Sequence, residues 1–373
     1  SSWPFVPVRE VFRKRDQAVI PKNLYGPVTY LGLENIVPNI GKIEGNITSE
    51  KPSDIKSLKN EFIPRDILYG KLRPNLNKVW LADRKGICST DIFVIEAIEE
   101  MVDPALYAFL FRSRRFNDVV MSQLKGAQLP RIGWASFSEL IIPLPTLSVQ
   151  KEIVAEIESY QKVIDGARAV VDHYRPRIPI RPEWPMVEIG TICELINGTA
   201  FKASDWERKE QGGLPIVRIQ NLNEPNAPFN YFSGSVSPRH LIEHNELLFS
   251  WSGSRGTSFG AHIWRGGRAI LNQHIFKILF PGNKAVREYL LHILNRAVAE
   301  IEENLHGGVG LVHITKGNLE RIKIPLPSLA VQKAIVAEIE AEQALVNTNR
   351  ELIARMEKKI QAVLARVWGE KPA

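Results

Sequence analysis

Apolar residues recur in alternating steps of four and three positions along two long segments of the chain, 147–175 and 329–368. A period of about 3.5 residues kept over several heptads is typical of a coiled-coil seam, so we predict two long helices that pair antiparallel. The alternative is two amphipathic helices packed on separate cores. The seam positions are Ile153, Ile157, Tyr160, Ile164 and Val171 in the first segment and Ile335, Ile339, Val346, Ile353 and Ile360 in the second.

The stretches before each long helix have a mixed pattern. Short runs rich in β-branched and aromatic residues predict strands, and runs of helical periodicity predict helices. The fold class that we expect is α+β, with two mixed domains separated by the paired helices and related by a pseudo-twofold axis. The predicted strands lie within 28–33, 88–95, 214–219 and 269–280, and the predicted helices within 104–121 and 283–304.

One stretch of the chain is written twice. IPLPTLSVQKEIVAEIE occupies 142–158 and IPLPSLAVQKAIVAEIE occupies 324–340. A repeat at a period of about 180 residues is far longer than that of a solenoid and indicates two duplicated domains. Weaker pairs upstream are DILYG at 66–70 with ELLFS at 246–250, DIFVI at 91–95 with HIFKI at 274–278, and Asn35 with Asn221.

The duplication predicts four parts along the chain. Pro-Leu-Pro fixes an extended entry before each long helix, and Thr146 and Ser328 are then suited to be the helix N-caps. The predicted parts are a first domain at 1–142, a first spacer helix at 143–178, a second domain at 179–324 and a second spacer helix at 325–373.

Composition narrows the functional classes. Hydrophobic residues make up 44% and charged residues 24% of the 373 residues, as in an ordinary soluble protein, and no apolar run has the length of a transmembrane helix. The net charge of +7 and the pI near 9.3 favour a polyanionic partner, most often nucleic acid. Two isolated cysteines, Cys88 and Cys193, predict buried thiols in a reducing cytoplasm.

Motifs of catalysis are missing from the sequence. It has no glycine-rich cofactor or phosphate loop, no Asn/Asp-Pro-Pro-Tyr of an amino-methyltransferase, and no His-x-His or His-Glu-x-x-His metal spacing. Glu207-Arg208-Lys209 matches half of a nuclease motif, which a charged surface explains. We therefore expect a protein that is not an enzyme and that binds no metal and no cofactor of its own.

Polar loop residues are suited to DNA. Arg matches the edge of guanine and Asn that of adenine, whereas Ser, Thr and Lys suit phosphates. The alternatives are polar hairpins without a ligand and hydrogen bonds within the strands. The candidate DNA-binding residues are Lys71, Arg73, Asn75, Lys78, Gln128, Arg131, Arg218, Gln220, Asn221, Ser252, Ser254, Arg255, Thr257, Gln273 and His274.

The order of domain, repeated helix, domain and repeated helix resembles the DNA-specificity subunit of Type I restriction–modification systems. The likeness rests on IPLP followed by Gln150-Lys151 or Gln332-Lys333, and on EWPMVEIGTICELINGTAF at 183–201, which looks like the opening of the family's second target-recognition domain. It covers essentially the whole chain.

This resemblance implies a reader and scaffold. In that family two target-recognition domains read the two parts of a split, asymmetric site in double-stranded DNA. The repeated helices set the gap and help to hold two methyltransferase subunits, which bind S-adenosylmethionine; motor-nuclease subunits that use ATP and Mg²⁺ can join them. We expect such a complex in the cytoplasm, with no membrane partner. The alternative is that the chain is the specificity region of a single-chain restriction–methylation enzyme, separated from its catalytic part.

Overall fold

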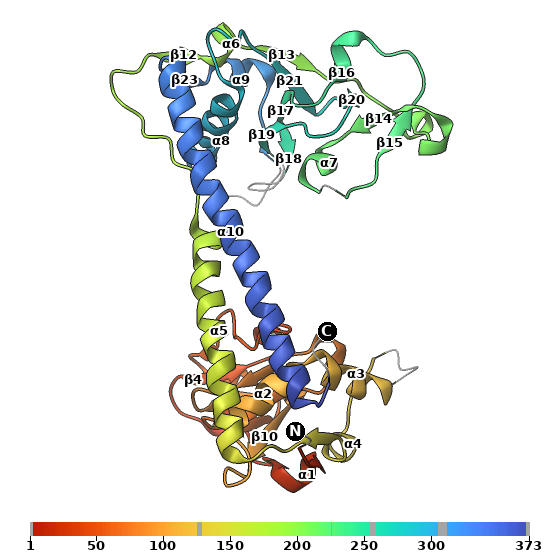
Figure 1. The fold of residues 1–373 in the computed structure, drawn as a ribbon, viewed down its shortest axis with the longest axis vertical. Coiled ribbons are helices and arrows are strands. Elements are labelled where there is room, and N and C mark those ends of the chain that lie inside the picture. The colour runs from red at the N-terminus through yellow and green to blue at the C-terminus, as the bar shows by residue number, and fades with distance from the viewer. Residues whose placement is uncertain (1–2, 125–128, 225, 254–258, 305–311, 371–373) are drawn as a thin grey trace. The chain divides into compact units, whose positions relative to one another are not determined.

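The computed structural model describes residues 3–124, 129–224, 226–253, 259–304 and 312–370 (Figure 1). By its internal contacts the chain divides into two compact units. Unit 1 consists of Ser1–Asp172 and Thr348–Ala373, and unit 2 of His173–Asn347. Each unit combines sheets with helices, which confirms the predicted α+β class.

Unit 1 contains two larger sheets. Its strands are β1 Phe5–Pro7, β2 Phe12–Lys14, β3 Ala18–Val19, β4 Val28–Leu31, β5 Thr48–Ser49, β6 Lys59–Phe62, β7 Ile67–Gly70, β8 Val79–Leu81, β9 Gly86–Cys88, β10 Ile92–Ala97 and β11 Ile141–Pro143. The first sheet has the order β2-β10-β7-β8 and is antiparallel throughout. The second has the order β3-β6-β9-β4-β5, in which β4 and β9 are parallel, and β1 pairs with β11 alone.

Unit 2 repeats this topology. Its strands are β12 Met186–Glu188, β13 Glu194–Asn197, β14 Leu214–Val217, β15 Asn230–Phe232, β16 Leu241–Ile242, β17 Leu247–Ser250, β18 Ser252–Gly253, β19 Gly260–Ile263, β20 Ala269–Leu271, β21 Ile275–Leu279, β22 Val312–His313 and β23 Lys323–Pro325. The order β13-β21-β17-β19 matches the first sheet of unit 1. The order β15-β14-β20-β16 matches four of the five strands of the second, β5-β4-β9-β6, including their parallel pair, and β3 has no counterpart in this sheet. The predicted duplication is therefore present in the strand order.

The α-helices agree with the prediction in place but not always in length. They are α1 Val8–Val11, α2 Pro104–Arg112, α3 Arg114–Ser122, α4 Trp134–Ser138, α5 Leu147–His173, α6 Ile189–Ile192, α7 Ile219–Asn223, α8 Arg287–Asn304, α9 Lys316–Arg321 and α10 Leu329–Val367. Short 3₁₀ turns lie at Pro21–Asn23, Leu33–Asn35, Pro52–Asp54, Pro74–Leu76, Ala203–Asp205, Lys209–Gln211 and Pro238–His240.

The segment 104–121, predicted as one helix, is two. The break is at Ser113, whose backbone is extended and whose hydroxyl accepts a hydrogen bond from the Phe116 N–H, so that it caps α3. A serine hydroxyl competes in this way with the helical backbone bonds. The segments 88–95 and 269–280 are likewise two strands each. In unit 1, β9 belongs to the second sheet and β10 to the first; in unit 2, β20 belongs to the second sheet and β21 to the first.

The two long helices end within two residues of 175 and 368, the ends of the predicted helical segments. Helix α5 has 27 residues, about 40 Å at the usual rise, and stops shortly before Pro176. Helix α10 has 39 residues and is followed by Gly369 at φ +74°. The N–H of Gly369 donates to the carbonyl of Arg366, and that of Glu370 to the carbonyl of Ala365, which is the Schellman pattern that a left-handed glycine permits.

Within unit 1, α5 and the C-terminal half of α10 run antiparallel (Figure 1). Arg168 pairs with Glu357 at 3.2 Å and Arg366 with Glu156 at 2.6 Å, so the partner number falls as the position along α5 rises. Most of the predicted seam residues are buried, Ile335 and Ile339 in the core of unit 2 and Ile153, Ile157, Ile164 and Ile360 in that of unit 1. Buried are Ile153, Ile157, Ile164, Ile335, Ile339, Val346 and Ile360, and half-buried are Tyr160, Val171 and Ile353.

The repeated glutamine of the IPLP motif anchors each long helix to its own domain. Gln150 is fully buried; its Oε1 accepts from the Asp103 N–H at 2.7 Å, and its Nε2 donates to the Met101 and Pro145 carbonyls at 3.0 and 2.8 Å. Gln332 makes the same three bonds, to the Val286 N–H at 2.8 Å and to the Lys284 and Pro327 carbonyls at 3.0 and 2.8 Å. The motif is thus the joint between domain and helix.

A buried tyrosine supports each joint. The Tyr107 hydroxyl donates to the Pro143 carbonyl at 2.9 Å, and the Tyr289 hydroxyl donates to the Pro325 carbonyl at 2.8 Å. Each of these prolines lies inside an IPLP sequence. The two tyrosines therefore occupy equivalent positions in the duplicated frame.

Candidate nucleic-acid interface

In both units the segment that follows a central strand of the first sheet, β7 or β17, pairs with the segment that precedes a short helix, α4 or α9. In unit 1 the segment after β7 pairs with the one before α4: Leu72 bridges Arg131, and the Ile132 N–H donates to the Lys71 carbonyl at 3.0 Å. In unit 2, β18 pairs with β22, and the Ile314 N–H donates to the Trp251 carbonyl at 3.1 Å. We call these the paired segments, residues 71–73 with 130–132 and 251–253 with 312–314.

The paired segments of unit 1 bring charged residues together, which we call face 1: Lys71, Arg73, Asp91 and Arg131. Arg131 forms an ion pair with Asp91 at 2.8 Å. The Lys71 ammonium lies 5.4 Å from the centre of the Phe93 ring. Partial burial lowers the pKa of Lys71, and the positive charges of Arg131 and Lys14 lower it further, against the opposing effect of Asp91.

The backbone of Arg73 joins the two paired segments beside face 1. It has φ +50°, and its N–H donates to the Pro130 carbonyl at 2.8 Å, so the left-handed turn ties it to the facing segment. Its side chain is exposed. Asn75, two residues on, is also exposed.

Aromatic and neutral polar residues meet beside the paired segments of unit 2. We call face 2 the set of Trp251, from a paired segment, and Gln273 and His274, from the turn before β21. The Trp251 ring stacks on Phe276 with centres 6.0 Å apart and lies 5.2 Å from the His274 ring. The Trp251 indole N–H donates to the Gln273 carbonyl at 3.1 Å. Nδ1 of His274 is buried without a hydrogen-bond partner among the described residues.

Faces 1 and 2 occupy equivalent positions. The Lys71 N–H donates to the Asp91 carbonyl at 3.0 Å, as the Trp251 N–H does to the His274 carbonyl at 3.3 Å. Lys71 therefore corresponds to Trp251 and Asp91 to His274, and both Lys71 and Trp251 lie against a phenylalanine of the sheet, Phe93 or Phe276. One backbone arrangement thus presents different chemistry in the two units.

The predicted pair of asparagines serves the fold. Asn221 is buried; its Oδ1 accepts from the Arg218 N–H at 3.0 Å, and its Nδ2 donates to the Ala227 and Pro228 carbonyls at 3.3 Å. Asn35 makes the matching bonds, accepting from the Gly32 N–H at 2.9 Å and donating to the Glu44 carbonyl at 3.1 Å. The alternative of internal hydrogen bonds therefore describes Asn221, which is not part of either face.

Several other candidates have partners within the protein. The Lys78 ammonium donates to the Leu33 carbonyl at 2.6 Å, and Ser252 is buried. The Arg218 guanidinium lies over the Trp206 ring at 5.2 Å, in the turn that leads into α7 rather than in a strand. Gln220 is exposed and donates to the Pro228 carbonyl at 3.4 Å. The candidates Gln128, Ser254, Arg255 and Thr257 lie outside the described residues.

The candidate residues did not include Asp91 and Trp251. A signal for Asp91 exists in the sequence, because DIFVI and HIFKI align and place it opposite His274. Trp251 gave no such signal, since a lysine occupies the equivalent position of unit 1.

Other chemistry is sparse in the described residues. They contain no group of three or more His, Cys, Asp or Glu residues suited to a metal ion, and none of their helices is long and apolar enough to cross a bilayer. Cys88 and Cys193 are both buried, as predicted, and burial raises the pKa of each thiol to about 12.

Comparisons with known proteins agree with the duplicated frame. A family model described as "Type I restriction modification DNA specificity domain" matches residues 1–168 and again 182–358. The Type I restriction enzyme MjaVIII specificity subunit of Methanocaldococcus jannaschii is 24% identical, over 96% of this chain and 89% of its own length. The Type I restriction enzyme EcoBI specificity subunit of Escherichia coli is 28% identical over 50% of this chain, and the aligned part is 39% of that protein.

A solved structure shares the fold. It is described as "Structural basis underlying complex assembly and conformational transition of the type I R-M system". Its TM-score is 0.68 at 22% sequence identity, with 98% of this chain and 97% of that chain covered.

Proposed function

Because the chain belongs to the family of Type I restriction modification DNA specificity domains, we propose that it is the DNA-reading subunit of a restriction–modification complex, without catalytic activity of its own. Each unit reads one part of a split, asymmetric site in double-stranded DNA. The observation that carries this proposal is that equivalent paired segments present different side chains in the two units.

Face 1 has the chemistry of a DNA contact. Burial and the neighbouring charges of Arg131 and Lys14 lower the pKa of Lys71, and a phosphate placed beside these cations relieves their repulsion. Arg131 suits the O6 and N7 edge of guanine, and Asp91 accepts from the N4 amine of cytosine. Their ion pair holds both side chains in place before DNA arrives.

Face 2 suits a different sequence. Gln273 matches the N6 and N7 edge of adenine, and Trp251 offers an apolar surface such as a thymine methyl group prefers. Since the faces differ at the two equivalent positions, Lys71 with Trp251 and Asp91 with His274, we expect the two half-sites to differ as well. A chain with two identical faces reads a palindrome instead.

The long helices are the spacer and the scaffold of this proposal. Their length sets the number of base pairs between the half-sites, and their outward surface holds two methyltransferase subunits. Apolar side chains exposed on these helices support a partner surface, including Val163 at 40%, Val170 at 45% and Leu345 at 66%. In the cytoplasm the partner subunits supply S-adenosylmethionine, and motor-nuclease subunits, where they join, supply the ATP and Mg²⁺ site.

A selection from random double-stranded DNA tests the proposal. The chain, assembled with two methyltransferase subunits of a Type I system, should enrich a site of two different short sequences separated by a fixed gap. Binding should weaken steeply as salt rises, because phosphate contacts release counterions. Enrichment of no sequence, or of one palindrome, contradicts the proposal.

A further inference from the structure

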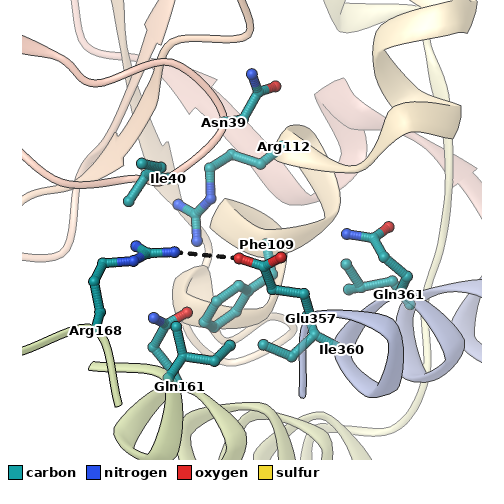
Figure 2. A pocket seen from close by; sticks show the side chains of 11 residues that line it. Asn39, Ile40, Phe109, Arg112, Gln161, Arg168, Glu357, Ile360 and Gln361 are labelled. Carbon is teal, nitrogen blue, oxygen red and sulfur yellow. Dashed lines mark hydrogen bonds and ion pairs between the residues drawn. The ribbon is translucent and has the colours of Figure 1, made fainter. Parts of the chain in front are cut away.

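A pocket in unit 1 lies beside the end of α2 and shares no lining residue with face 1. Its volume is about 380 Å³, and it is lined from the loop at Asn39, from α2 at Phe109 and Arg112, from α5 at Gln161 and Arg168, and from α10 at Glu357 and neighbours (Figure 2). The lining joins the recognition domain of unit 1 to both long helices. Figure 2 shows the side chains of Arg112 and Arg168 extending toward the middle of the group.

Arg112 is a positive charge without an acidic partner. Its guanidinium stacks over the Phe109 ring at 4.8 Å, and its Nη1 donates only a long bond, 3.5 Å, to the Val79 carbonyl. Among the described residues no carboxylate forms an ion pair with it, although a guanidinium offers five N–H donors. Burial lowers the pKa of Arg112 to about 10, so the group stays charged at neutral pH.

The other charges around the pocket are already matched. Arg168 pairs with Glu357 at 3.2 Å, and Lys42 pairs with Asp165 at 2.7 Å. Gln161 donates to the same Asp165 oxygen at 3.1 Å. The surplus at the pocket is therefore the single positive charge of Arg112, which a monovalent anion balances.

The backbone leaves space for the guanidinium. Gly41 has φ +72°, a conformation that favours glycine, and a side chain there would begin 2.2 Å from Nη1 of Arg112. The loop can thus lie directly against the charged group.

The duplicated frame does not require this arginine. Tyr107 and Tyr289 are equivalent, so Arg112, five residues after Tyr107, corresponds to Leu294, which is buried in unit 2. An aliphatic residue satisfies the packing at this position, whereas unit 1 keeps a charge there. The packing of the fold therefore does not explain why unit 1 has an arginine at this position.

We propose that this pocket binds a small oxyanion through Arg112, with the amide groups of its lining as further donors. The ligand chemistry is that shared by dihydrogen phosphate and a simple carboxylate, since both present oxygens to the guanidinium fork. Bound there, the anion links the α2 end of the recognition domain to α5 and α10. The inference concerns the free chain and does not depend on DNA reading.

Calorimetric titration of the full chain with sodium phosphate or sodium acetate, at pH 7 and constant ionic strength set with sodium chloride, tests this proposal. We expect a saturable one-site isotherm for at least one of the two anions, which identifies the ligand class. At ten times its dissociation constant that anion should raise the Tm by about 3 °C.

Three variants locate the site. Arg112→Leu, the residue that unit 2 carries, should lose the saturable phase, while Arg114→Leu, at an exposed arginine two positions on, should keep it. If Arg112→Leu does not fold, Arg112→Lys decides, because it keeps the charge but loses the fork and should bind at least about tenfold more weakly. The proposal is overturned if neither anion saturates on the unaltered chain, or if the altered and unaltered Arg112 chains bind alike.

Discussion

Replacing Gln150 with leucine should loosen unit 1 without changing the DNA sequence that the chain reads. The glutamine side chain is fully buried and satisfies three backbone groups, the Asp103 N–H and the Met101 and Pro145 carbonyls. Leucine is of similar volume but has no hydrogen-bonding group. The substitution therefore removes the anchor of α5 while leaving its apolar packing nearly intact.

The size of the effect follows from the three groups left behind. A buried polar group without a partner costs about 1–3 kcal/mol, and loop groups near the surface regain part of this from water. We expect a total of about 2–5 kcal/mol in the free energy of opening of unit 1. That is a large part of the ~5–15 kcal/mol that holds a typical domain together.

Hydrogen exchange measured by mass spectrometry reports this free energy separately for each unit. Gln150→Leu should speed exchange in peptides around 101–103 and 147–157, and the mirror variant Gln332→Leu around 284–286 and 329–339. Gln343→Leu is the matched control, since that side chain is half-buried on α10 and makes a long bond to Asn347 at 3.4 Å. It should shift the free energy by less than about 0.5 kcal/mol.

Two results would refute the reasoning. If Gln150→Leu shifts the exchange of unit 1 no more than the control does, the three bonds do not anchor the helix. If it changes the preferred base in a half-site, the motif takes part in reading and is not merely a joint.

Further predictions concern the faces, the thiols and the spacer. Arg131→Ala should weaken binding by about 1–3 kcal/mol and relax only one half-site, and Trp251→Ala should relax only the other, as binding to singly altered sites will tell; loss in both from either variant contradicts separate reading. Cys88 and Cys193 should stay unreactive to Ellman's reagent at pH 8 until guanidinium is added. Rapid labelling of the folded chain contradicts their burial. The thiol pKa is about 12 in the folded chain and ~8.5 in the unfolded chain, so the free energy of unfolding should fall as the pH rises above ~8.5. Deleting one heptad from each long helix should shorten the gap by about 10 Å, or three base pairs, in the selected DNA, and an unchanged gap excludes the spacer role.

Much of the fold could be predicted because its signals are local. The seam of the long helices follows from spacing along one segment, and Pro176 and Gly369 mark the helix ends by their own backbone preferences. The break at Ser113 could not be predicted in this way. A serine continues a helix or caps one, and the choice here depends on tertiary packing: Ser113 is buried, and the indole N–H of Trp368 donates to its hydroxyl at 3.2 Å from the far end of the chain.

The candidate site was harder to predict because a loop residue's role depends on what it meets. Lys71 and Lys78 lie in one polar loop and look alike in the sequence, yet the Lys78 ammonium bonds the Leu33 carbonyl and the Lys71 ammonium lies beside Arg131. Asn221 resembles a base-reading residue, but its repeated partner Asn35 makes the same turn bonds.

The duplication itself separates these roles. Positions that keep their residue in both copies, such as Gln150 with Gln332 or Asn35 with Asn221, bond the backbone that the copies share. Positions that keep their backbone bonds but change their residue, such as Lys71 with Trp251 or Asp91 with His274, are not required by that backbone. A residue that the shared frame does not need is open to selection for a ligand, which is why we expect the DNA-reading residues among the differences between the copies rather than among their identities.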